Sequence, residues 1–227
     1  MGYSTAQKLV AELLGTALLL TIVIGSGAMG FRMAGGVEGM ALMANATAVG
    51  AGLYVLISMF GPISGAHFNP AVTMSFLLRQ EIAPGLAAAY VGVQMIGAVL
   101  GAIAANLMFE FPWIELSLNP RAGSNLLLAE VIATFGLVGV ILALLPVARE
   151  RIPAGVGLYV FAGLWFTSST CFANPAVTLG RMLTVSWTGI RPEDVLGFVG
   201  AQLLGAAMAV VLFGWLSQPG NGAGEDV

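Results

Sequence analysis

Apolar residues run along this chain in long blocks, and polar residues are confined to the short stretches between them. The six longest apolar blocks lie at about residues 8–29, 38–60, 84–109, 124–146, 153–170 and 193–217. A helix that crosses a bilayer needs about 20 mostly apolar residues, so each block predicts one transmembrane helix. Two shorter apolar pieces, at about 69–79 and 174–185, favour helices that are too short to span.

The composition indicates that lipid surrounds these helices. Only 8% of the 227 residues are charged and 58% are hydrophobic, whereas soluble globular domains carry about 25% charged residues. A water-facing surface needs more charge than this chain supplies, so the lipid bilayer is an expected partner. The first block is interpreted as a transmembrane helix and not as a secretory signal, because it extends to about Met29 and contains Glu12.

The few titratable residues argue against several classes of function. The net charge is −3 and there is no basic run, so we expect no nucleic-acid partner. His67 is the only histidine and Cys171 the only cysteine. These two residues cannot build a metal centre alone, and we expect no metal and no cofactor. No Ser/His or paired-aspartate constellation is visible, so we expect the chain not to be an enzyme.

The chain contains an internal repeat. Three segments recur in the same order: AELLGT at 11–16 resembles AEVIAT at 129–134, NPAVT at 69–73 returns unchanged at 174–178, and VGVQMIG at 91–97 resembles VGAQLLG at 199–205. Each half, about 1–110 and 120–217, holds three spans. An odd number of spans inverts the second half, which places a solute path between the halves. We predict one transmembrane channel domain over 1–227, with a disordered Gly-rich tail at 218–227.

The repeated pentapeptide begins as a helix begins. Asn is a preferred N-cap, and Pro suits the first helical position. Inversion brings the two helix starts together near the bilayer midplane, where each end carries roughly half a positive charge that repels cations. The two asparagine amides are candidates for donating hydrogen bonds to a passing water or hydroxyl group. The predicted pore residues are Asn69, Pro70, Ala71, Asn174, Pro175 and Ala176.

The segment SGAHFNPAVT at 64–73 resembles the first signature loop of the aquaporin and aquaglyceroporin family, the major intrinsic proteins. The second NPA box and the paired helix glutamates match as well, so the resemblance covers nearly the whole chain. It implies an all-α membrane protein with six transmembrane helices and two re-entrant half-helices in a right-handed bundle. It also implies a homotetramer with one pore per subunit, which conducts water and small uncharged solutes passively.

Glu12 and Glu130 are the acidic residues deepest in the predicted spans. An intramembrane carboxylate is costly, and it is a functional candidate for that reason. It either relays protons, as an ion-coupled secondary transporter would require, or accepts hydrogen bonds from backbone N–H groups of a re-entrant loop. The resemblance favours the second role, bracing of the loops. His67 is interpreted as a pore-side loop residue, because partner metal ligands are lacking.

The chain departs from the family directly after the second NPA box. Most family members have Arg there, and this chain has Val177. In the family this Arg and three further residues form the narrow outer constriction. Comparison places Val49 and Cys171 at two of those positions. The position on the fifth span falls on Gly163 or Leu164. The resemblance therefore implies a constriction that is wide, apolar and uncharged.

Loss of the Arg resembles a bacterial subgroup found with arsenic-resistance genes. This implies that neutral metalloid hydroxides such as arsenous acid, As(OH)3, pass together with glycerol-like solutes, down their gradients. Several alternatives stay open. Val177 can be neutral drift in an ordinary water channel, or the channel can be a general one for water, glycerol, urea or ammonia. An ion-coupled transporter and a structural junction protein are the more distant alternatives.

The expected location is multi-pass in the bacterial inner membrane, as the resemblance implies. The eight basic residues divide evenly between the two sides if both termini are cytoplasmic. Arg149 and Arg151 crowd into one short loop, which favours the cytoplasmic side for that loop and therefore for both termini.

Overall fold

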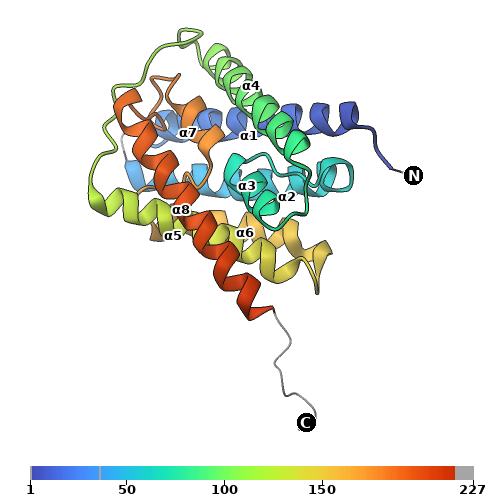
Figure 1. Ribbon diagram of the computed structural model, residues 1–227. Coiled ribbons are helices and arrows are strands. Elements are labelled where there is room, and N and C mark those ends of the chain that lie inside the picture. The colour runs from blue at the N-terminus through green and yellow to red at the C-terminus, as the bar shows by residue number, and fades with distance from the viewer. Residues whose placement is uncertain (1, 36, 218–227) are drawn as a thin grey trace, which may run out of the picture.

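The computed structural model describes residues 2–35 and 37–217. Within these ranges the regular secondary structure is entirely helical, without a β-strand (Figure 1). The helices are α1 (Thr5–Met33), α2 (Glu38–Ser64), α3 (Pro70–Leu78), α4 (Pro84–Met108), α5 (Ser124–Leu144), the 3-10 turn η1 (Arg149–Arg151), α6 (Ile152–Phe166), α7 (Pro175–Arg181) and α8 (Pro192–Leu216). The expected tail at 218–227 lies outside the described residues.

Five of these helices, α1, α2, α4, α5 and α8, are long and apolar enough to cross a membrane. The sixth span is α6, preceded by η1. The apolar pattern predicts a helix to residue 170, but α6 ends at Phe166 because Thr167 takes an extended backbone, with φ −103° and ψ 133°. Likewise α7 ends at Arg181 and not near residue 185. The chain turns back there, and the Ile190 N–H donates to the Arg181 carbonyl at 3.2 Å.

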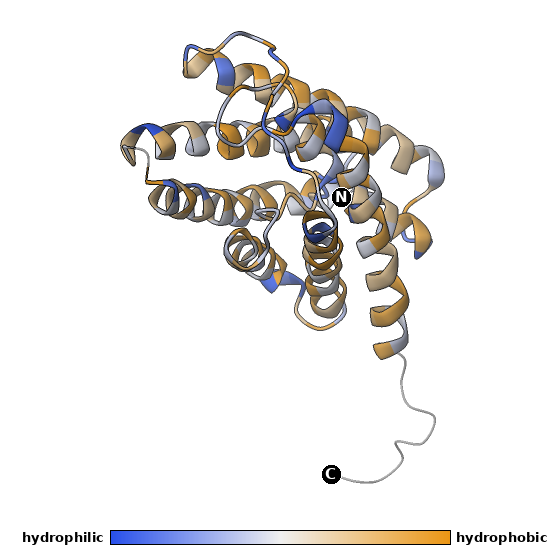
Figure 2. Ribbon diagram, turned by 90° about the vertical axis from the view of Figure 1, so that its left-hand side faces the viewer, coloured by the Kyte–Doolittle hydropathy of each residue, from blue (hydrophilic) through white to orange (hydrophobic). Residues whose placement is uncertain are grey.

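The outer surface of the helices is apolar. Large hydrophobic side chains project from them, with Leu196 82% exposed, Val211 75% and Leu158 69%. Figure 2 shows a ribbon that is largely orange, with blue restricted to short segments. Such a surface is stable only when lipid covers it, because water would have to solvate every one of these side chains.

Glycines let the long helices approach closely. A Cβ at Gly97 of α4 would lie 2.6 Å from the Leu13 carbonyl oxygen of α1. Between α2 and α6, Gly50 and Gly157 face each other's carbonyl groups, and a Cβ on either would come within 2.9 Å of the opposite oxygen. The hydrophobic effect does not drive helix association inside a bilayer. Small residues at the contacts instead allow close van der Waals packing of the helices. The half-helices α3 and α7 each pack against both α4 and α8.

Candidate functional site

The two half-helices begin at the repeated NPA triplets. Asn69 is the N-cap of α3, and its Oδ1 accepts from the Ala71 N–H at 2.9 Å. Asn174 caps α7 in the same way, with Oδ1 accepting from the N–H groups of Ala176 at 2.9 Å and Val177 at 3.3 Å. The two triplets therefore start the two short helices α3 and α7 in the same way.

The asparagine amides connect the halves at their centre. Asn69 Nδ2 donates to the Ala173 carbonyl, and Asn174 Nδ2 donates to the Phe68 carbonyl, each at 2.8 Å. Each side-chain NH2 has two hydrogens, so these crossed bonds use one of them. Both asparagines line the central cavity. The second N–H of each is thus available to a solute there.

Glu12 holds the loop before α3. Its Oε1 accepts from the His67 N–H at 2.9 Å and from Ser64 Oγ at 2.6 Å. Its Oε2 accepts from the Phe68 N–H at 2.7 Å and from Gln94 Nε2 at 2.8 Å. The carboxylate is fully buried, and these four donors satisfy it where water is absent. A carboxylate that accepts from two backbone N–H groups of the loop is what the bracing role requires.

Glu130 stands in the same relation to the loop before α7. Its two oxygens accept from the N–H groups of Phe172 at 3.0 Å and Ala173 at 2.9 Å. Gln202 of α8 donates to it at 2.6 Å and to Thr178 Oγ1 at 2.8 Å. The inverted halves thus carry the same glutamate–glutamine arrangement, although the two glutamates belong to different helices and different loops.

Both loops contain residues in the left-handed region of backbone space. Ala66 and Phe68 have φ of 51° and 48°, and their counterparts Cys171 and Ala173 have 49° and 46°. Side chains other than glycine pay about 1–2 kcal/mol for this conformation. The glutamate hydrogen bonds to adjacent N–H groups hold the loops in it.

One cavity of about 830 Å³ runs along the interface of the halves. It reaches Arg149 and Glu150 at one end and Arg181 at the other. Its wall includes the two asparagines, His67 and the four expected constriction residues Val49, Leu164, Cys171 and Val177. Leu164 lines the cavity, whereas Gly163 packs behind Cys171, where a Cβ would lie 2.6 Å from Sγ. The structure therefore favours Leu164 at the fifth-span position.

The cavity end next to α3 and η1 is here named the α3 mouth. His67 stacks there on Phe76 of α3, with ring centroids 4.6 Å apart and planes inclined by 23°. Its Nδ1 lies 3.1 Å from Thr73 Oγ1. His67 is thus a wall residue of the path, in contact with aromatic and hydroxyl groups.

The opposite end, beside the loops 109–123 and 182–191, is named the α7 mouth. Arg181 lies there with its guanidinium carbon 3.4 Å from the ring centroid of Phe172. The guanidinium of Arg121 lies 4.9 Å from the same centroid. Neither residue was among the predicted site residues. Arg181 is the last residue of α7 and follows Val177 by four positions, a spacing that puts both on one helix face; this spacing was the available signal.

The four residues expected at the constriction carry no charge, but a cation lies close to them. The residues Val49, Leu164, Cys171 and Val177 are apolar or weakly polar and are each 4–5% exposed. The cavity wall one turn beyond Val177, however, carries the Arg181 guanidinium. The short helix predicted at 174–185 contains Arg181, but the apolar pattern did not indicate that this side chain lines the cavity.

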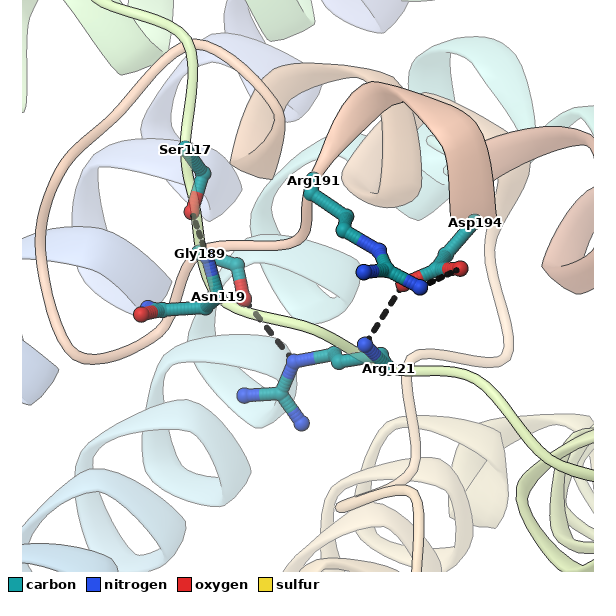
Figure 3. Close-up of polar contacts among 6 residues, drawn as sticks. All are labelled: Ser117, Asn119, Arg121, Gly189, Arg191 and Asp194. Carbon is teal, nitrogen blue, oxygen red and sulfur yellow. Dashed lines mark hydrogen bonds and ion pairs between the residues drawn. The ribbon is translucent and has the colours of Figure 1, made fainter.

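Arg121, in the loop 109–123, is held in place by polar contacts with α8 and the loop 182–191 (Figure 3). Its backbone N–H donates to Asp194 Oδ2 at 2.6 Å, and its Nε donates to the Gly189 carbonyl at 2.8 Å. Asp194 is itself held by Arg191, which donates to both carboxylate oxygens at 2.7 and 3.2 Å. Burial lowers the pKa of the Arg121 guanidinium to about 10, so that the group is still protonated at neutral pH.

Comparison with known proteins decides the family. The model of the major intrinsic protein family matches residues 2–170, which is most of the chain. The chain belongs to the major intrinsic protein family. Channels of this family pass water and small solutes, and the chain is accordingly a multi-pass membrane channel. It is not a member of an enzyme family.

Individual members of the family support this assignment. Aquaglyceroporin AqpS of Rhizobium meliloti (strain 1021) is 48% identical over 217 residues, covering 96% of this chain and 93% of that protein. Human Aquaporin-1 is 32% identical over 227 residues, covering 94% and 82%. The X-ray structure of the aquaglyceroporin from Plasmodium falciparum matches with a TM-score of 0.70 at 22% identity, over 92% of this chain and 94% of that one. The last match shows that the fold is shared.

Proposed function

We propose that this channel conducts small uncharged solutes rich in hydroxyl groups, namely glycerol-like polyols and neutral metalloid hydroxides such as arsenous acid. The observation that carries the proposal is the wall around Val177. Four side chains without charge, from Val49, Leu164, Cys171 and Val177, line the cavity where most family members place an Arg. A valine occupies far less space than an arginine, so the path there admits solutes wider than water.

The polar part of the wall suits the same solutes. The second N–H groups of Asn69 and Asn174 face the cavity and can donate to a hydroxyl oxygen. Most of the cavity wall is apolar, with side chains such as Val49, Leu164 and Val177. A solute therefore meets few polar partners and passes without a deep binding site. The absence of charge on arsenous acid at neutral pH avoids the cost of bringing an ion into this narrow path.

Further features of the proposal follow from the scaffold. We assign Glu12 and Glu130 the role of bracing the re-entrant loops, since each accepts two loop N–H groups and no chain of titratable groups links them. The protein acts in the bacterial inner membrane with both termini cytoplasmic. It assembles as a homotetramer, in which the exposed apolar helix faces would be shared between neighbouring subunits and lipid. The name of the 48% identical relative, an aquaglyceroporin, is compatible with the solute class.

Proteoliposome flux tests the proposal directly. The purified full chain is reconstituted, and permeabilities to water, glycerol, urea and arsenous acid are compared with those of empty liposomes. Glycerol and arsenous acid should both pass well above the empty-liposome rate. Passage of water, glycerol and urea without arsenous acid would support the alternative, a general channel without a metalloid role. Passage of water alone would contradict the wide path.

A further inference from the structure

Arg181 has the position and the surroundings of a pore residue. It is only 5% exposed, yet it lines the central cavity. It follows Val177 by four residues on α7, one helical turn, or about 6 Å along the helix axis. Side chains on a helix lean toward its N-terminus, and the N-terminus of α7 lies at the centre of the pore. The long side chain of Arg181 therefore leans back toward the level of Val177.

The hydrogen bonding of Arg181 leaves donors unused. Its Nε donates to the Thr188 carbonyl oxygen, and its guanidinium carbon lies against the Phe172 ring. Its two Nη atoms donate to no group in residues 2–35 and 37–217. A guanidinium carries five N–H groups, so four hydrogens of this buried cation are available to a solute in the cavity.

The charge at the α7 mouth is also unneutralised. Within the described part of the chain, no carboxylate comes within ion-pair distance of Arg181 or Arg121. Glu130 is close enough to attract both guanidinium groups but forms an ion pair with neither. Asp194, which accepts from the Arg121 backbone N–H, is paired with Arg191. A buried cation without an acid is costly, and carbonyl groups and an aromatic face offset only part of that cost. An intramembrane charge kept at such a cost marks a function.

Arg121 adds a second positive charge close to Arg181. Both guanidinium groups lie close to the ring of Phe172. Arg121 Nη1 also lies 3.4 Å from the Ser169 carbonyl oxygen and 3.5 Å from Thr170 Oγ1, in the loop that leads to Cys171. Two guanidinium groups from different segments thus lie near one ring of the cavity wall, where Arg181 lines the cavity itself.

We propose that Arg181, reinforced by Arg121, selects solutes by charge in this channel, one helical turn away from Val177, so that different residues select charge and size. The residue after the second NPA box is left small, which keeps the path wide. The two guanidinium groups, one helical turn outward, repel cations. Arg181 also offers N–H donors to the oxygens of an entering neutral solute. This assignment rests on the proposed function only for the identity of the solute; the exclusion of cations is a separate claim.

Cation leak through reconstituted full-length protein tests the assignment. Arg181→Gln removes the charge but keeps a donor for the Thr188 carbonyl. We expect proton and potassium leak to rise about tenfold over wild type. Glycerol should still pass, but more slowly than in wild type, because the variant loses most of the donors that Arg181 offers to a solute. Arg121→Gln should raise the leak by a smaller factor. An unchanged leak in an Arg181→Gln protein that still conducts glycerol would overturn the assignment.

Arg32→Gln is the matched control. Arg32 lies at the end of α1, where it also donates to a backbone carbonyl, that of Phe109, and sits over the Phe109 ring at 5.4 Å. It does not line the cavity. Its substitution removes the same kind of group outside the path, and we expect no change of leak. A leak that rises equally in this control would mean that general loosening, and not the charge at the mouth, is responsible.

Two further variants keep the test decisive if Arg181→Gln does not fold. Arg181→Lys keeps the charge and should keep the leak low. The double exchange Val177→Arg with Arg181→Val moves the cation one turn inward; it should also keep the leak low but reduce glycerol permeability at least about fivefold. A high leak in both folded variants would overturn the assignment. Failure of wild type to conduct glycerol or arsenous acid would instead reject the proposed function and leave the leak comparison valid.

Discussion

At the α3 mouth the imidazole of His67 stacks on Phe76, whereas at the equivalent place in the α7 mouth the ring of Phe172 stacks on Arg181. The two pairs occupy the same places in the repeat, two residues before Asn and seven residues after it. One pair is aromatic throughout, and the other contains a guanidinium. The inverted halves therefore give the pore one aromatic mouth and one cationic mouth.

The surroundings of the two pairs are otherwise closely matched. A third ring meets each loop ring at 73°: Tyr90 of α4 at a centroid distance of 5.3 Å, and Phe198 of α8 at 5.1 Å. The glutamate braces, the crossed asparagine bonds and the left-handed loop residues also repeat. The difference teaches that the two halves share one scaffold and differ in a few side chains at each mouth, where we propose that solutes are selected.

Removing the shared brace should have the largest effect. Glu12→Ala or Glu130→Ala leaves two buried loop N–H groups without an acceptor, at about 1–3 kcal/mol for each unpaired group. It also removes one of the two hydrogen bonds of the neighbouring glutamine amide. We expect loss of most folded protein, measured as the thermal midpoint and the monodisperse fraction in detergent. Glu38→Ala, at an exposed helix start, is the control. Wild-type stability of both variants would contradict the brace.

The same glutamates allow a test of the rival proton relay. Glu→Gln at either position keeps part of the hydrogen bonding and removes the titratable group. A brace predicts transport that hardly depends on pH, in wild type and in these variants alike. Marked pH dependence in wild type that disappears in a folded Glu→Gln variant would favour an ion-coupled transporter.

Breaking the centre of the pore should lower flux more than stability. Asn69→Ala or Asn174→Ala removes a helix N-cap, worth about 1 kcal/mol, and with it a crossed hydrogen bond and a donor in the wall. We expect assembled protein whose glycerol flux is reduced several-fold in proteoliposomes. Wild-type flux in both variants would contradict the claim that the two asparagines line the pore.

Mercurial inhibition probes the wall near the α7 mouth alone, since the α3 mouth has Ala66 where this mouth has Cys171. Cys171 lines the cavity and is the only thiol in the chain. A mercury adduct on it should block most of the flux, while Cys171→Ser should conduct and resist. Equal inhibition of the Cys171→Ser variant would place the mercury site elsewhere.

A smaller effect concerns the loop backbone. Thr170 takes a φ of 61°, where the other half has Gly65 with a φ of 91°. Thr170→Gly should relieve strain and stabilise the fold by up to about 1 kcal/mol, seen as a raised thermal midpoint. The reverse exchange, Gly65→Thr, should destabilise. A lowered midpoint for Thr170→Gly would mean that the contact of Thr170 with Arg121 outweighs the strain.

The sequence indicates the scaffold well because the scaffold follows local rules. Apolar blocks mark the spans, Asn and Pro mark the starts of α3 and α7, and the repeat implies inversion. The ends of α6 and α7 were not predictable from hydropathy, because Thr167 and Met182 leave the helix for tertiary reasons. The apolar pattern continues past the ends of both helices.

The α7 mouth shows a second limit of sequence reasoning. The stacking of Arg121 and Arg181 on one ring joins residues 60 positions apart along the chain, and no local pattern brings them together. Gly163 and Leu164 could not be separated either, because that choice depends on the rotation of α6 in the bundle. The substitution at Val177 was visible in the sequence, but the place of Arg181 in the cavity wall was not predicted.

The ratio of arsenous acid to water permeability in wild type and in Val177→Arg, reconstituted at matched protein levels, tests the central claim most directly. The new guanidinium would narrow the path between Val49 and Cys171, and like charge on Arg181 would hold it away from the α7 mouth. The account predicts that the ratio falls at least about fivefold, with water flux reduced less than arsenous acid flux. A ratio that stays unchanged in a folded variant would contradict the account, because solute size would then be selected away from Val177.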